Sequence, residues 1–179
     1  MKLKLAQIPP EGGEFDRVLE QAWLREVLSG AGSVDFWATE GRTVKVFAKR
    51  TGVEVLVQSD FFLELTTDCS TCLEDFRLEV PVAFSLTLRP RPAGQDPMPA
   101  DLELRSEDLE EFFFDGEEID LEGILREQIL LALPMYPRCS ENCRGLCPVC
   151  GANLNKGECG CDRGVVDPRW ATLKKIAEK

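Results

Sequence analysis

Residues 139–151 read Cys139-Ser-Glu-Asn-Cys143-Arg-Gly-Leu-Cys147-Pro-Val-Cys150-Gly151, and the pair Cys159-Gly-Cys161 follows after a short loop. This stretch of 23 residues holds six of the eight cysteines of the chain, and the other two form a separate C-x-x-C at Cys69 and Cys72. The cysteines therefore come as four close pairs. Pairs at such spacings place two sulfurs on one ion with a turn between them, which is typical of structural zinc.

We interpret all eight cysteines as metal ligands: Cys69, Cys72, Cys139, Cys143, Cys147, Cys150, Cys159 and Cys161. The chain contains no histidine, which excludes imidazole ligands as well as Ser-His-Asp and Cys-His catalysis. A site of four thiolates is closed and leaves no position for an activated water. We therefore expect structural zinc and no enzymatic activity. An iron–sulfur cluster on the same thiols is an alternative.

Two ways of sharing the thiols are open. In the arrangement that we favour, the pairs Cys147/Cys150 and Cys159/Cys161 close on themselves, as in half of a zinc ribbon. The pair Cys139/Cys143 then meets Cys69/Cys72, which gives two four-cysteine sites. The rival is a single zinc ion bound by the six C-terminal cysteines, with Cys69 and Cys72 free or paired with each other.

The composition is that of a folded protein with one sizeable core and room for a small satellite, since the 179 residues are 44% hydrophobic. No apolar run approaches the roughly 20 residues that span a bilayer, and the N-terminal residues lack a secretory signal. We expect a cytoplasmic protein with reduced thiols, no membrane contact and no small-molecule substrate. Disulfides would be the alternative if a secretory signal had been removed.

The net charge of −11 is unevenly distributed along the chain. Residues 1–138 carry a net charge of −13, and residues 139–179 carry +2. Because a phosphate backbone is repelled by acidic surfaces, only the C-terminal region can tolerate RNA. The candidate contacts to RNA or to another partner are its basic residues Arg144, Lys156, Arg163, Arg169, Lys174 and Lys175.

The hydrophobic periodicity predicts an α+β fold. We expect helices near 14–29 and 120–133, the second capped by Asp120, and a short basic helix from Asp167. Between them, alternating residues predict strands near 34–38, 44–48, 53–57, 61–66 and 76–88, with turns at Glu40-Gly41, Thr51-Gly52 and Ser59-Asp60. These strands would form an antiparallel meander or barrel-like sheet. The expected domains are 1–136, an acidic sheet domain, and 137–179, a zinc-knuckle region.

Two further features bear on function. Cys69 and Cys72 lie between two expected strands, so they occupy the turn of a hairpin, which presents a pair of ligands rigidly. Residues 101–122 contain 11 acidic residues against Arg105 alone, with Phe112 to Phe114 among them. This segment is either a solvated edge or a surface that binds a basic partner such as a ribosomal protein.

Four blocks of the sequence resemble the YceD family, the large ribosomal RNA subunit accumulation proteins. They are Cys69-Ser-Thr-Cys72-Leu-Glu-Asp-Phe76, the segment from Ile119 to Pro134, the cysteine block from Cys139 to Asn155, and Asp167-Pro168-Arg169 with the residues that follow. The resemblance covers about residues 60–179 well and residues 1–58 only in outline. It implies a role in the accumulation or maturation of large-subunit ribosomal RNA, without an enzymatic mechanism.

The sequence thus favours a ribosome-assembly factor that binds precursor RNA or a ribosomal protein through a zinc-stabilised surface. One alternative is an acidic interaction module or chaperone for a basic partner. A less favoured one is a thiol redox or metal-dependent enzyme, because Cys69 and Cys72 would lie in a β-turn. Such a turn lacks the helix N-terminus that lowers the pKa of a redox thiol.

Overall fold

The computed structural model describes residues 1–30, 32, 34–91 and 112–162. Contacts between Cα atoms divide the chain into two units. The first unit consists of Met1–Thr67 and Phe76–Met135, and the second consists of Asp68–Asp75 and the chain from Tyr136 onward. The tip of one hairpin therefore belongs to the second unit, although its two strands belong mainly to the first.

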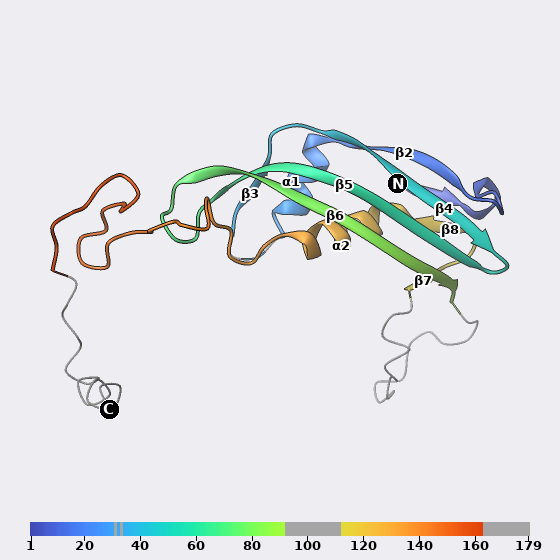
Figure 1. Cartoon of the computed structure of the whole chain (residues 1–179). Coiled ribbons are helices and arrows are strands. Elements are labelled where there is room, and N and C mark those ends of the chain that lie inside the picture. The colour runs from blue at the N-terminus through green and yellow to red at the C-terminus, as the bar shows by residue number, and fades with distance from the viewer. Residues whose placement is uncertain (31, 33, 92–111, 163–179) are drawn as a thin grey trace, which may run out of the picture. The chain divides into compact units, whose positions relative to one another are not determined.

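A mostly antiparallel sheet is the frame of the first unit (Figure 1). Its strands follow the order β2-β4-β5-β6-β7, and β3 pairs with one end of β5. The bounds are β2 Gly13–Leu19, β3 Phe36–Ala38, β4 Arg42–Thr51, β5 Glu54–Asp68, β6 Asp75–Pro90 and β7 Phe112–Phe114. A second, two-stranded sheet pairs β1 (Lys2–Lys4) with β8 (Glu118–Asp120), and a 3-10 turn follows β1 at Leu5–Gln7.

Strict alternation of buried and exposed residues runs along the two longest strands, as the sequence predicts for the region of β6. In β5 the side chains from Val55 to Thr67 at every second position are buried, and their neighbours face outward. In β6 the same pattern brings Val80, Val82 and Leu88 into the core. Pro81 points outward from β6. Because successive side chains of a strand point to opposite faces, one face of the sheet is largely apolar, with Ser59 and Thr67 as buried polar residues.

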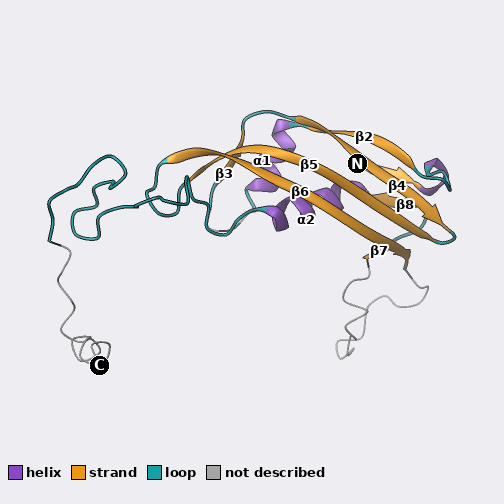
Figure 2. Cartoon of the chain, in the orientation of Figure 1, coloured by secondary structure: helices purple, strands orange, loops and turns teal. Residues whose placement is uncertain are grey.

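Two helices cover the apolar face (Figure 2). Helix α1 (Gln21–Leu28) and helix α2 (Leu121–Ala132) each bury one stripe, and both stripes join the core formed by the strands. Asp120 caps α2 by accepting a hydrogen bond from the backbone N–H of Glu122 at 3.1 Å. The helices also contact each other through Trp23, whose Nε1 donates to Glu122 Oε1 at 2.9 Å. Neither helix is long and apolar enough to span a membrane.

The structure corrects the expected helix over 14–29, because residues Gly13–Leu19 form β2. This strand pairs in antiparallel register with β4, from Gly13 opposite Ala48 to Leu19 opposite Arg42. Phe15, Arg17 and Leu19 face the inner side, and their period of two fits the sheet. The helical spacing of apolar residues corresponds to a helix only from Gln21 onward. In the residues before Gln21, pairing with β4 produces a strand although the apolar residues also fit a helical pattern.

Two further expectations for the sheet are also corrected. The turn expected at Ser59-Asp60 does not exist, because β5 continues through both residues. Ser59 occupies a buried position there, and its hydroxyl donates to the backbone O of Lys45 at 2.7 Å.

The sheet is also not wholly antiparallel, because β7 runs parallel to the end of β6. Barrel closure is not confirmed, since the order of the described strands begins at β2 and ends at β7. The short helix expected from Asp167 lies outside the described residues.

The packing of α2 leads to a matched prediction. Leu125 is fully buried in the core, whereas Leu131 on the same helix is 71% exposed. We expect Leu125→Ala to lower the free energy of unfolding by about 2–5 kcal/mol, since it removes buried methyl groups and leaves a cavity. Leu131→Ala should change it by no more than about 0.5 kcal/mol. Urea unfolding followed by circular dichroism measures both, and equal losses would contradict the placement of α2.

Candidate metal centres

The eight cysteines lie in two clusters of four, both within the second unit. The first cluster joins Cys69, Cys72, Cys139 and Cys143, and the second joins Cys147, Cys150, Cys159 and Cys161. Within each cluster all sulfur atoms lie within 4.8 Å of one another. Of the two arrangements left open by the sequence, the structure shows the one with two four-cysteine groups. Each group can hold one metal ion.

The spacing of the sulfurs fits a tetrahedral ion better than a disulfide. All eight cysteines are free thiols. In the first cluster the Sγ atoms of Cys69 and Cys143 are 3.8 Å apart, and those of Cys72 and Cys139 are also 3.8 Å apart. A tetrahedral zinc site with Zn–S distances of about 2.3 Å requires sulfurs separated by about 3.8 Å. The donor set and its spacing therefore suit a thiolate-bound metal.

The two C-x-x-C turns that begin the clusters have the same backbone hydrogen bonds. In the first turn, Leu73 N donates to Cys69 O at 2.9 Å, and Cys69 N donates to Glu74 O at 2.9 Å. In the second turn, Gly151 N donates to Cys147 O, and Cys147 N donates to Ala152 O, each at 2.8 Å. In both turns the hydrogen-bond partners of the first cysteine lie four and five positions after it. The chain thus builds the same knuckle twice, from different sequences.

The residue after the second cysteine has a left-handed backbone in both knuckles. Its φ is +73° at Gly151 and +57° at Leu73, and Leu73 is the only non-glycine residue with positive φ in the described part of the chain. This conformation is easy for glycine and costs other residues roughly 1 kcal/mol. A leucine in this conformation is held in place by the backbone hydrogen bonds of the turn.

Backbone N–H groups point at the sulfurs that begin the knuckles. At Cys147, hydrogen bonds from the N–H groups of Cys150 and Val149 lower the thiol pKa. At Cys69, burial raises the pKa, but hydrogen bonds from backbone N–H groups, led by that of Cys139, outweigh it and lower the pKa to about 6. The N–H of Cys139 lies 3.4 Å from Cys69 Sγ. These groups stabilise thiolates, which are the form that binds a metal.

Other thiols of the clusters shift in the opposite direction. Burial, followed by the neighbouring sulfurs, raises the pKa of Cys139 to about 12. The sulfurs of Cys150 and Cys159 raise that of Cys161 to about 12. Like charges that share one site disfavour full ionisation of the group. A bound cation removes this penalty, so each cluster is electrostatically suited to a divalent ion.

The hairpin tip is fastened to the C-terminal cysteines by the backbone around it. The backbone N–H and the hydroxyl of Ser70 both donate to Pro137 O at 2.9 Å, two residues before Cys139. Leu146 N donates to Thr71 O at 3.2 Å. Gly145 lies so close to Thr71 that an added Cβ would be 2.8 Å from Thr71 Cγ2 and 3.0 Å from Thr71 O. This close approach places Cys143 beside Cys69 and Cys72.

Asn155 connects the loop of the second cluster to a ligand of the first. Its Nδ2 donates to Cys143 Sγ at 3.4 Å, and its Oδ1 accepts from Arg144 N at 2.8 Å. The hydrogen bond from Asn155 is also the leading cause that lowers the pKa of Cys143. Neither Asn155 nor Gly145 is predicted from the sequence as part of the site. A side-chain amide and a glycine close to the cysteines are the only signals that could have indicated them.

Two of the proposed RNA or partner contacts are engaged in ion pairs within the second unit. Arg144 pairs with Glu158 at 3.3 Å, and Lys156 pairs with Glu74 at 2.7 Å. Both cations remain about half exposed or more, at 50% and 69% of the side chain. The other four candidates, Arg163, Arg169, Lys174 and Lys175, lie outside the described residues. The described basic surface of this unit is therefore small and largely paired with acidic side chains.

Comparisons with known proteins agree on one family. Residues 59–177 match the family described as the large ribosomal RNA subunit accumulation protein YceD. An uncharacterized protein of Mycobacterium tuberculosis is 35% identical over 123 residues, which are 68% of this chain and 55% of the relative. The chain thus spans about half the length of such mycobacterial relatives.

Plant relatives carry the family's name. The large ribosomal RNA subunit accumulation protein YCED homolog 1, chloroplastic, of Arabidopsis thaliana is 36% identical over 62 residues, which are 35% of this chain and 19% of the relative. The Zea mays protein of the same name is 29% identical over 118 residues, 54% of this chain and 40% of the relative. No solved structure matches the chain significantly.

The close approach of Gly145 to Thr71 leads to a prediction for the first cluster. Both Gly145→Ala and Gly151→Ala place an alanine at a φ near +70°, which costs about 1 kcal/mol. Only Gly145→Ala adds a clash, since nothing lies within 4 Å of a Cβ at Gly151. We expect maleimide to label the buried Cys69 at least about tenfold faster in Gly145→Ala than in Gly151→Ala, as read by peptide mass mapping. Equal labelling rates would show that the approach does not hold the cluster together.

Proposed function

The chain belongs to the YceD family of large ribosomal RNA subunit accumulation proteins, and from this premise we propose that it is a non-enzymatic factor for the accumulation of large-subunit ribosomal RNA. In the proposal the second unit is held together by two structural zinc ions and binds precursor RNA or a ribosomal protein. The observation that carries the zinc assignment is the pair of four-cysteine clusters built on one repeated knuckle.

The donor chemistry supports zinc as the ion. Each cluster offers four sulfurs and no oxygen or imidazole ligand, and zinc is the metal that such tetrahedral thiolate sites most often hold in cytoplasmic proteins. When bound, the metal would supply folding free energy on the order of 10 kcal/mol. The protein would supply the thiolates, the N–H groups that stabilise them, and Asn155 beside Cys143.

A closed four-thiolate site supports a structural role over a catalytic one. Such a site has no open coordination position at which water or substrate could be activated. The expected absence of a lowered thiol pKa is corrected, because backbone N–H groups lower the pKa of Cys69 to about 6 without a helix N-terminus. A thiol redox role for Cys69 and Cys72 is still not favoured, since each lies within 3.8 Å of a further cysteine sulfur in the same cluster. In the proposal these thiols are ligands and not an exchangeable pair.

The nature of the partner follows from charge. Residues 139–179 carry a net charge of +2, whereas the rest of the chain is strongly acidic. Direct contact with RNA would therefore be confined to the second unit and would weaken steeply with salt. A ribosomal protein as direct partner is the alternative within the same proposal. Because bacterial ribosomes assemble in the cytoplasm, the proposal places the protein there.

Metal analysis of the purified chain tests the zinc assignment. We expect two zinc ions per chain, and one after Cys69→Ser with Cys72→Ser, because only the first cluster loses ligands. Ser140→Ala, an exposed change next to Cys139, serves as the matched control and should keep two. One zinc ion in the unchanged chain that survives the double substitution would refute the arrangement. Absorption between 300 and 500 nm would indicate an iron–sulfur cluster instead.

The cellular role is tested by the ratio of large-subunit to small-subunit ribosomal RNA. We expect this ratio to fall in cells that lack the protein and to recover when the unchanged chain or Ser140→Ala is supplied. The variant with Cys69→Ser and Cys72→Ser should not restore it. Gradient fractionation with RNA quantification provides the measurement. Full recovery with the double cysteine variant would separate the first cluster from the function.

A further inference from the structure

A groove of about 690 Å³ lies in the first unit and belongs to neither cysteine cluster. It is formed by β7, β8, the start of α2 and the residues between these elements. Its lining combines phenylalanines with carboxylates, which is unusual for a surface that only meets water. The proposed zinc-stabilised unit does not use this groove.

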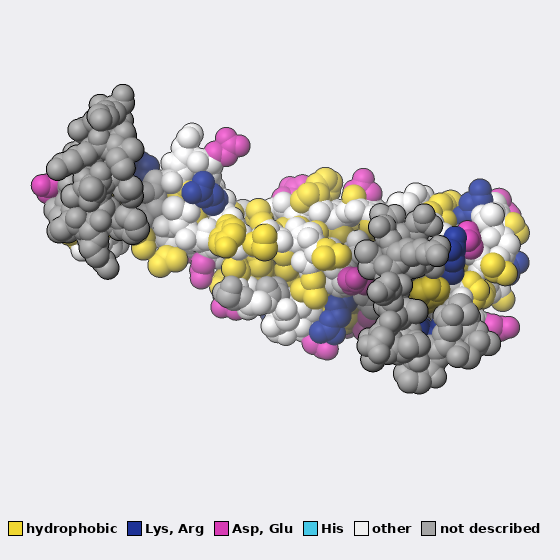
Figure 3. Space-filling view, turned by 90° about the horizontal axis from the view of Figure 1, so that it is seen from below, with side chains coloured by type: hydrophobic (Ala, Val, Ile, Leu, Met, Phe, Trp, Pro, Cys, Tyr) yellow, Lys and Arg dark blue, Asp and Glu magenta, His cyan; other side chains and the backbone are white. Residues whose placement is uncertain are grey.

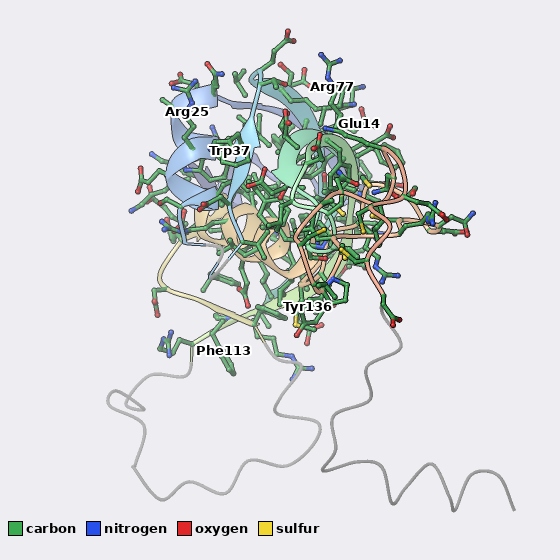
Figure 4. The ribbon with its side chains drawn as sticks, turned by 90° about the vertical axis from the view of Figure 1, so that its left-hand side faces the viewer. Glu14, Arg25, Trp37, Arg77, Phe113 and Tyr136 are labelled. Carbon is green, nitrogen blue, oxygen red and sulfur yellow. The ribbon has the colours of Figure 1, made fainter. Side chains whose placement is uncertain are left out.

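The floor of the groove is apolar. Leu88 of β6 is buried, while Phe112 of β7 and Ile124 of α2 are half-buried and line the space. Phe113 is 40% exposed and projects from β7 away from the sheet (Figure 4). Hydrophobic side chains also gather along the face that Figure 3 shows. Burial of a partner's apolar side chain on this floor would lower the free energy of the complex.

The rim of the groove is acidic. Among the described residues that line it, one is a cation, Lys2, and five are carboxylates: Asp115, Glu117, Glu118, Asp120 and Glu127. Lys2 pairs with Glu118 at 3.2 Å, and Arg91 pairs with Asp115 at 2.7 Å. Among the described residues, no cation pairs with Glu117 or Glu127. Within the described part of the chain, the carboxylates of Glu117 and Glu127 are therefore available to pair with a cation of a binding partner.

Charge selects among the possible occupants. RNA is disfavoured because the rim repels phosphates. The chain's own neighbouring segment, 101–111, carries six acidic residues and one basic residue, so the same repulsion acts on it. A basic segment of another protein is the occupant whose charge complements the rim and whose apolar side chains suit the floor.

We propose that this groove binds a basic peptide segment of a partner protein. An apolar side chain of the segment lies on the floor formed by Leu88, Phe112 and Ile124, and flanking lysine or arginine side chains lie against Glu117 and Glu127. Because the groove and the clusters belong to different units, this site is independent of metal binding. It adds a protein-binding activity to the role proposed for the second unit.

Fluorescence anisotropy with two labelled probes tests the proposal on the chain of 179 residues. The first probe is a peptide with one phenylalanine flanked by two lysines on each side, and the second has glutamates in place of the lysines. We expect the lysine peptide alone to bind, and its Kd to rise about tenfold with Glu117→Gln and Glu127→Gln together. Ile124→Ala, which shortens a side chain of the floor, should weaken binding as well. Zinc content should stay unchanged in every variant.

A matched control separates the groove from the overall acidity of the chain. Glu11→Gln with Glu79→Gln removes the same charge from two exposed positions outside the groove, and it should leave the Kd unchanged. Equal weakening by both pairs, or binding of the glutamate peptide, would overturn the proposal. A labelled 12-nucleotide single-stranded RNA whose affinity changes with Glu117→Gln and Glu127→Gln, but not with the control pair, would also overturn it. Loss of zinc in a groove variant would contradict the independence of this site from the clusters.

Discussion

Four sulfur atoms held within 4.8 Å of one another are the constraint on which the second unit depends. Thiolates so close together repel unless a cation shares their charge, and the opposed pKa shifts of Cys69 and Cys139 express this conflict. The surrounding backbone is arranged to tolerate ionised sulfur, with N–H groups that point at Cys69 and Cys147. The described part of this unit has only one short β-bridge, between Leu146 and Asn153, so ligands and turns replace an apolar core.

The repetition of one knuckle shows how little sequence this constraint requires. Cys69-Ser-Thr-Cys72-Leu73 and Cys147-Pro-Val-Cys150-Gly151 share only their cysteines, yet their backbone hydrogen bonds match partner for partner. Gly151 adopts the left-handed conformation freely, whereas Leu73 adopts it against its own preference. The common element is therefore the geometry that two sulfurs and their N–H donors impose, and the intervening residues adapt to it.

The sequence predicts the features that follow from local pattern and chemistry. Cysteine spacing was enough to favour the two groups of four, and alternation was enough to place β6. Pattern failed where a distant partner decides the structure. Residues 14–19 form a strand because β4 pairs with them, and Ser59 stays in a strand because Lys45 accepts its hydroxyl hydrogen bond. The approach of Gly145 to Thr71 joins residues far apart in sequence, so no local signal could reveal it.

The position of the first knuckle at the tip of the β5–β6 hairpin has a consequence for the order of folding. The second cluster draws its ligands from 15 consecutive residues, 147–161, and can close as soon as these have been synthesised. The first cluster joins Cys72 to Cys139 across 67 positions, and the intervening chain contains β6 and α2 of the other unit. Closing a loop of this length costs conformational entropy, and the remaining cost is smaller once the intervening chain has become compact. We therefore expect the first cluster to close late, on a chain that has already folded its core.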